Sequence, residues 1–270
     1  MNDTTERALP LHTAQTLDDY LVYLKHVALY AFAEKFCAQK IILDLGCGEG
    51  YGASALARAA RFVVAADYAF DAVTHARAKY ATANLAFVVC DAQRLPFRRA
   101  AFSAAISFEV IEHLPNVRAY LEELKRVNVG AAILSTPNRL MRLLPLQKPW
   151  NRFHLREYAP RDFARALRAV FARVDVRGIT ARADILAVEK KRVQQNPLIA
   201  YPRMIAQMFL PRGVYARVKK IAGDSVQSNN RINARLPATS FDAQNYSAAD
   251  FTISSNAPAD WITLVAICER

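Results

Sequence analysis

Short apolar runs alternate with stretches of helical periodicity along the first two thirds of the chain. Continuous apolar runs of five or six residues are typical of buried strands, and they occupy 41–45, 62–66, 85–90, 104–108 and 131–135. Between and around them, helices are predicted over 20–36, 53–60, 72–80, 119–128 and 160–170. Strand and helix recur at intervals of roughly 20 residues, which predicts an α/β fold with a doubly wound, mostly parallel sheet.

Two further strands, 174–176 and 262–267, bring the expected sheet to seven. The stretch between them is long. Its first half is basic and apolar, with Pro197, Pro202 and Pro211 as helix breakers, and its second half is rich in Asn, Ser and Ala. We therefore expect an N-terminal helical segment (1–40), a core domain (41–179 and 260–270) and an insertion or cap (180–259) before the last strand.

The residues that follow the first strand are candidates for ligand binding, because open α/β sheets bind ligands beyond the carboxyl ends of their strands. Gly46, Gly48 and Gly50 alternate there with Cys47 and Glu49. Glycines at this spacing let the backbone turn sharply and approach a ligand closely. The dinucleotide fingerprint would need a third glycine at position 51, where the chain has a tyrosine.

Acidic residues end the next three strands. Asp67 lies 21 residues after Gly46, where a carboxylate can accept both ribose hydroxyls of an adenosine. Asp91 ends the third strand, where it can accept the adenine amino group, and Glu109 ends the fourth. A single acid at a strand end is often only a helix cap, but three in succession near one crevice indicate a binding site.

These segments together resemble the class I S-adenosylmethionine-dependent methyltransferases of the type-11 group, bacterial enzymes that occur with glycan and small-molecule biosynthesis. The resemblance covers residues 20–178 and rests on ILDLGCGEGYGASALA, VVAADYAFDAVTHARAKY, FVVCDAQRLPF, AAISFEVIEHLPN, ILSTPN and NRFHLREYAPRDF. It implies a Rossmann-like fold and S-adenosyl-L-methionine as the cofactor. It places Asp67 on the ribose, Asp91 and Ala92 on the adenine, the Gly46–Gly50 loop along the methionine end and Phe108 beside the cofactor. Asp44, Cys47, Glu49, Tyr68 and Glu109 complete the set of candidate cofactor contacts.

Two histidines are candidate catalytic residues if the acceptor is a hydroxyl that must lose a proton. His113 follows the fourth strand, and His154 lies in a polar loop beyond the fifth. His113 can equally anchor its loop by hydrogen bonds, and His154 can equally be part of a loop scaffold. No His, Cys, Asp or Glu cluster has the local spacing of a metal site, so we expect no metal requirement.

The formal net charge is +12, from 36 Lys and Arg against 24 Asp and Glu, but it is spread along the chain. The four cysteines form no CxxC pair, and no stretch is long and apolar enough to span a membrane, which indicates a cytoplasmic protein. Met204 to Ile221 alternates apolar with basic residues. Such a segment can be a lid over the site or can lie on an anionic membrane at its inner face.

Three functions compete. The first is O-methylation of a sugar, glycan or lipid-linked small molecule, in line with a role in polysaccharide biosynthesis. The second is RNA methylation, which the charge permits. However, the sequence shows no aromatic stacking platform, no added RNA-binding module and no Asn/Asp-Pro-Pro-Tyr/Phe motif, so a nucleic-acid partner is not expected. The third is a non-catalytic protein that only binds S-adenosylmethionine.

Overall fold

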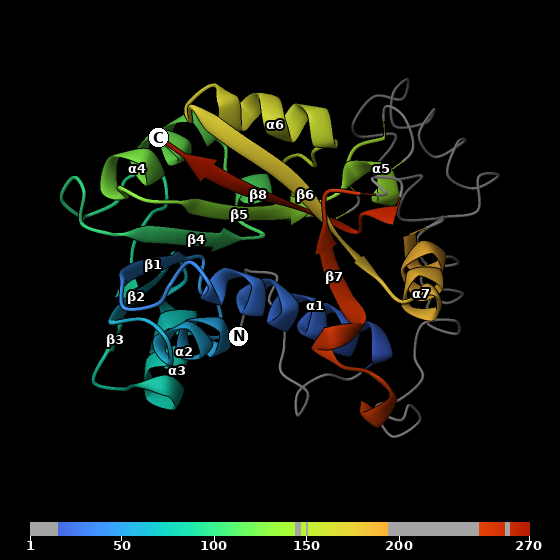
Figure 1. The fold of residues 1–270 in the computed structure, drawn as a ribbon, viewed down its shortest axis with the longest axis horizontal. Coiled ribbons are helices and arrows are strands. Elements are labelled where there is room, and N and C mark those ends of the chain that lie inside the picture. The colour runs from blue at the N-terminus through green and yellow to red at the C-terminus, as the bar shows by residue number, and fades with distance from the viewer. Residues whose placement is uncertain (1–15, 144–146, 150, 194–242, 257–259) are drawn as a thin grey trace, which may run out of the picture.

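A computed structural model describes residues 16–143, 147–149, 151–193, 243–256 and 260–270. These residues form a single eight-stranded sheet with helices on both faces (Figure 1). The strands are β1 (Ile41–Leu45), β2 (Phe62–Asp67), β3 (Leu85–Val89), β4 (Ala104–Phe108), β5 (Ala132–Pro137), β6 (Arg173–Ala181), β7 (Phe251–Ser254) and β8 (Thr263–Glu269). The helices are α1 (Leu17–Glu34), α2 (Tyr51–Ala57), α3 (Phe70–Tyr80), α4 (Val117–Val127), α5 (Arg139–Arg142), α6 (Pro160–Arg168) and α7 (Ala183–Val193), with short 3-10 turns η1 (Ile111–His113), η2 (Ala243–Asn245) and η3 (Ala248–Asp250).

The strand order is β3-β2-β1-β4-β5-β8-β6-β7, and the first five of these strands run parallel. This confirms the predicted doubly wound α/β class. The short apolar runs form strands because their side chains are covered on both faces, and β4 and β5 are buried along their whole length. The carboxyl ends of β1, β2 and β4 therefore meet at one edge of the sheet.

Two hydrophobic cores lie on the two faces of the sheet. Leu29 of α1, Leu56 of α2 and Ile42 of β1 belong to one core. Leu43 of β1 faces the other way, into a core with Tyr120 of α4 and Phe163 of α6. Because successive strand residues point to opposite faces, adjacent positions of β1 serve both cores.

The N-terminal helix packs on the sheet as part of the first core. It begins with a capping box, in which the Thr16 hydroxyl accepts the Asp19 N–H and the Asp19 carboxylate accepts the Thr16 N–H. Figure 1 shows α1 crossing the sheet close to β7. The segment predicted over 1–40 thus supplies a helix to the core from residue 17 onward.

The sheet has one strand more than the predicted seven. β7 lies within the stretch expected to form an insertion, and it pairs antiparallel with β6, with Ile179 opposite Ile253. β8 lies between β5 and β6 and is antiparallel to both. The basic segment from Met204 to Ile221, for which a lid or a membrane contact was considered, lies outside the described residues.

Candidate functional site

A cavity of about 550 Å³ opens at the carboxyl ends of β1, β2 and β4. Of the twelve predicted cofactor contacts, ten line it, namely Gly46, Cys47, Gly48, Glu49, Asp67, Tyr68, Asp91, Ala92, Phe108 and Glu109. Both candidate catalytic histidines, His113 and His154, line it as well. The structure thus brings the cofactor candidates and the histidines into one cavity, although they come from four strand ends and a distant loop.

The glycine loop between β1 and α2 needs its glycines for different reasons. Gly46, Gly48 and Gly50 all have positive φ, at 83°, 50° and 83°, a region that favours glycine. A Cβ on Gly46 would lie 2.2 Å from a Val110 methyl carbon, whereas a Cβ on Gly48 would meet no atom within 4 Å. Gly46 therefore allows close packing, and the backbone at Gly48 borders open space in the cavity.

Asp67 joins the glycine loop to the end of β2. One carboxylate oxygen accepts the Gly48 N–H at 2.9 Å, and the other accepts the Ala69 N–H at 2.9 Å. A carboxylate oxygen has two lone-pair sites, so each retains capacity to accept a hydroxyl from a ligand. Tyr68, which follows directly, lines the cavity and leaves 77% of its surface exposed.

Asp91 holds the turn after β3. Its Oδ1 accepts the backbone N–H of Gln93 at 2.8 Å and the side-chain amide of the same residue at 3.2 Å. Asp91 is exposed toward the cavity that it lines. Since an acidic strand end of this kind also accepts an exocyclic amine, the pair Asp67 and Asp91 can hold the two ends of a nucleoside.

Two of the twelve predicted contacts, Asp44 and Gly50, are not among the residues that line the cavity. Asp44 is fully buried beneath the glycine loop, where the Tyr30 hydroxyl donates to its two oxygens at 3.2 and 3.3 Å. Burial raises the pKa of Asp44 to about 7, against the lowering effect of the Tyr30 hydrogen bond. Gly50 serves as the N-cap of α2. Both residues shape the loop from outside the cavity.

Glu109 faces a lysine that the sequence did not single out. Lys25 of α1 is buried, and its Nζ lies 3.7 Å from Glu109 Oε2. Burial raises the pKa of Glu109, but the positive charge of Lys25 and of neighbouring cationic groups outweighs it and lowers the pKa overall. The hydroxyl of Ser135 also donates to Glu109 Oε1, at 3.1 Å. Glu109 is therefore held as a carboxylate.

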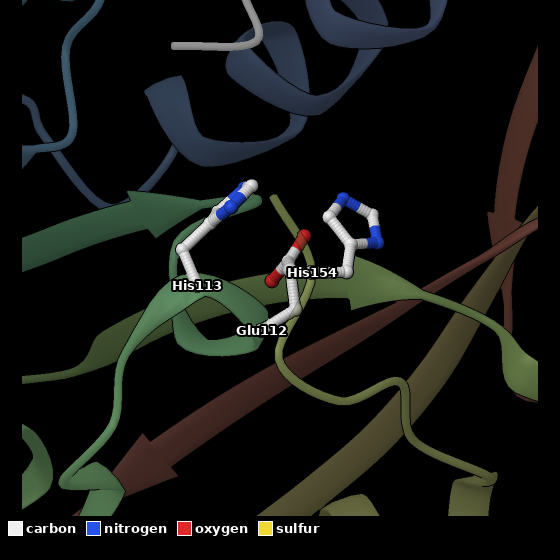
Figure 2. Close-up of side chains that lie close together, drawn as sticks. All are labelled: Glu112, His113 and His154. Carbon is white, nitrogen blue, oxygen red and sulfur yellow. The ribbon is translucent and has the colours of Figure 1, made fainter. Parts of the chain in front are cut away.

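Glu112, His113 and His154 lie together at the cavity wall (Figure 2). Glu112 and His113 come from η1, and His154 comes from the loop between α5 and α6. Each offers one ligand atom, and the three atoms lie within 4.8 Å of one another. The two imidazole rings are nearly perpendicular, with centroids 4.9 Å apart. Spacing along the sequence, on which the expectation of no metal requirement rested, does not reveal this cluster, because the fold brings its residues together.

Hydrogen bonds fix both imidazole rings through the same atom. His113 Nδ1 lies 3.0 Å from the Phe153 carbonyl oxygen, which can only accept, so this nitrogen carries the proton. His154 Nδ1 lies 2.8 Å from the Glu157 carboxylate, which itself lies 3.4 Å from the Arg142 Nε. In the neutral form of each ring the lone pair is therefore on Nε2.

The loop that carries His154 is anchored to η1. The backbone carbonyl of Glu112 accepts the N–H of Leu155 at 2.9 Å, and Arg156 donates to the Pro115 carbonyl at 3.1 Å. Polar groups of this loop thus make several hydrogen bonds within the protein. Together with Lys25, Glu112, Glu157 and Arg142 are site residues that the sequence analysis did not single out.

Comparison with known proteins finds matches over part of this chain. Residues 43–133 match the family described as "Methyltransferase domain". A probable S-adenosylmethionine-dependent methyltransferase of Mycobacterium tuberculosis is 35% identical over 156 residues, which cover 57% of this chain and 55% of that protein. A fatty-acid O-methyltransferase of Mycolicibacterium smegmatis is 34% identical over 121 residues, covering 44% and 43%. The chain spans about half the length of the curated relatives it matches.

The fold is also that of solved methyltransferases. The crystal structure of an S-adenosylmethionine-dependent methyltransferase from Thermotoga maritima aligns with a TM-score of 0.53 and 10% identity, covering 91% of this chain and 89% of that one. At this identity the likeness concerns the fold alone.

None of the described helices is long and apolar enough to cross a membrane.

Proposed function

Because the chain carries a class I S-adenosylmethionine-dependent methyltransferase domain, we propose that it transfers a methyl group to a hydroxyl oxygen of a sugar, glycan or lipid-linked small molecule. One observation carries the proposal. The nucleoside-binding candidates Asp67 and Asp91 line the same cavity as the two histidines at which an acceptor proton could be handled.

The residues of the cavity fit S-adenosyl-L-methionine as the cofactor. Asp67 has acceptor capacity for ribose hydroxyls, and Asp91 for the adenine amine. The open backbone at Gly48 leaves room along the loop, and the carboxylates of the cavity suit a cationic ligand. When bound, the cofactor supplies a methyl group on an electrophilic sulfonium. The protein's own tasks are then to align the acceptor with that methyl and to exclude water.

An oxygen acceptor is favoured by the histidine pair. His113 Nδ1 donates to the Phe153 carbonyl, and His154 Nδ1 donates to the Glu157 carboxylate. In each neutral ring the lone pair on Nε2 can then accept the proton of a nearby hydroxyl. The fatty-acid O-methyltransferase among the relatives acts on oxygen, which supports the same atom type here. We propose a polyhydroxylated compound as the acceptor. We also propose that the protein acts in the cytoplasm, in contact with the inner face of the membrane.

A labelling experiment tests the function. The purified protein is incubated with S-adenosylmethionine carrying a radioactive methyl group and with an extract of its source cells, which is then separated into RNA, protein, lipid and polysaccharide. We expect the label in polysaccharide or lipid-linked material, in an alkali-stable ether, and we expect Asp67→Ala to reduce it. Label in RNA or protein would overturn the acceptor class. Cofactor binding without any transfer in all fractions would favour a non-catalytic protein.

A further inference from the structure

The cluster of Glu112, His113 and His154 has the chemistry of a cation site. Two segments about forty residues apart bring one carboxylate and two imidazoles together, with the carboxylate between the two rings (Figure 2). Ligand atoms on one transition-metal ion at roughly 2.0–2.2 Å from it lie at most about 4.4 Å apart. Since the three atoms already lie within 4.8 Å of one another, a shift of a few tenths of an ångström closes the set.

Both histidines are oriented as metal ligands usually are. A ligating histidine generally donates its other N–H to a carboxylate or a backbone carbonyl, which fixes the tautomer and raises the basicity of the coordinating nitrogen. His113 donates to the Phe153 carbonyl and His154 to the Glu157 carboxylate. Glu157 is buried and lies next to Arg142, so its carboxylate is held in place behind His154.

Glu112 supplies an independent observation that points to a ligand. The residue is fully buried and lines the cavity, and its Oε2 accepts the Thr136 hydroxyl at 3.0 Å. Its Oε1 has no hydrogen-bond partner among the described residues. A buried carboxylate oxygen without a partner is unfavourable, and a bound cation would compensate for it.

We propose that Glu112, His113 and His154 bind one divalent transition-metal cation in the wall of the cavity. Magnesium and calcium prefer all-oxygen ligand sets, whereas two imidazoles with a carboxylate suit manganese, iron or zinc. Three protein ligands leave coordination positions for water or for a ligand in the cavity, as in catalytic metal sites.

The cation would change how the cluster acts on an acceptor, a role that rests on the proposed function. Coordination of the acceptor hydroxyl to a divalent cation lowers the pKa of that hydroxyl and orients its oxygen. With both Nε2 lone pairs on the cation, the histidines would act as ligands rather than as proton acceptors, and the proton of the coordinated hydroxyl would pass to water as the methyl group moves from the sulfonium to the oxygen. A chelator would then abolish transfer while leaving cofactor binding intact.

Metal binding is measured directly, without cofactor or acceptor. The protein is stripped with EDTA, dialysed against manganese chloride, and the bound Mn²⁺ is counted by elemental analysis and titrated by electron paramagnetic resonance. We expect one Mn²⁺ per chain, with nitrogen couplings from the imidazoles in the pulsed spectrum. Glu112→Gln and His154→Ala should each weaken binding at least tenfold, and Glu157→Gln about 10–100-fold because it acts through His154.

Matched controls separate the cluster from nonspecific binding. Glu122→Gln removes an exposed carboxylate on α4, and His75→Ala removes a histidine on α3, and both should bind Mn²⁺ as the parent protein does. Thermal unfolding of each variant checks that it folds, and His113→Ala replaces any variant that does not. Mn²⁺ binding that is absent, or is unchanged in every folded cluster variant, would overturn the site. Tight Mn²⁺ binding without methyl transfer to oxygen would overturn the proposed function and leave the metal site standing.

Discussion

Replacing Asp67 with alanine should weaken S-adenosylmethionine binding by about 1.5–3 kcal/mol, the usual contribution of a hydrogen bond to a charged group. The dissociation constant would then rise roughly 10–150-fold. The carboxylate has two tasks at the end of β2. It is available to the cofactor ribose, and it also accepts the N–H groups of Gly48 and Ala69 at 2.9 Å each. Its loss therefore removes contacts to the cofactor and leaves the glycine loop less ordered.

Asp67→Asn should give an intermediate loss. The amide oxygen can still accept one of the two backbone N–H groups, but the amide nitrogen faces the other with a donor. Asp71→Ala, an exposed carboxylate in the first turn of α3, is the matched control and should bind normally. Isothermal titration calorimetry on folded variants measures all three. Unchanged affinity in both Asp67→Ala and Asp91→Ala would refute the assignment of this cavity to the cofactor.

Three further predictions follow from the same contacts. The pKa of about 7 for buried Asp44 lies above the value near 4 in an unfolded chain. The free energy of unfolding of the ligand-free protein should therefore fall by up to about 4 kcal/mol as the pH rises from about 4 to 7. Urea unfolding measured across this range should show a smaller dependence on pH for Asp44→Asn. Gly178→Ala should destabilise the fold by about 1–3 kcal/mol in the same assay, because its Cβ would lie 1.8 Å from the Trp261 ring; an unchanged transition would contradict that packing. His113→Ala or His154→Ala should lower turnover by roughly 10²–10⁴ with cofactor affinity retained, and full turnover in both would remove the histidines from the reaction.

The strand-end residues could be predicted from the sequence because a parallel sheet brings successive carboxyl ends to one edge. The same rule correctly located Gly48, Asp67 and Asp91 at one cavity. It could not tell that Asp44, one position before the end of β1, is fully buried and bonds to Tyr30 instead of lining the cavity. Side chains alternate faces along a strand, and which face meets the ligand depends on the helix packed there.

The sequence of β7, the strand that was not predicted, carries no clear local signal. β7 has only four residues and follows a segment rich in Asn, Ser and Ala, so neither length nor composition distinguishes it from a loop. Its pairing depends on β6, whose Gly178 lies opposite Ser254, far away in the chain. Propensity is a weak guide to a short edge strand, since its stability comes from the neighbour that it joins.

The Lys25 and Glu109 pair shows a similar limit at the site. Lys25 fits the polar side of a surface helix by its residue type, and lysine is almost never fully buried unless it is paired. Here α1 packs across the sheet, so this face of the helix meets the end of β4, where Glu109 provides the opposite charge. The partner could only be identified once the position of α1 was known.

The histidine cluster depends on backbone contacts that sequence spacing does not encode. His113 is positioned by η1 directly after β4, so the strand-end rule reaches it. His154 lies in a loop that is held in place just after it, by the Leu155 N–H on the Glu112 carbonyl and by a parallel bridge between Asn138 and Tyr158. Local spacing of His and Glu therefore cannot exclude a ligand set of this kind. The rule that does apply is topological, because a loop returning to the carboxyl edge of the sheet carries its polar side chains to the residues that end the strands.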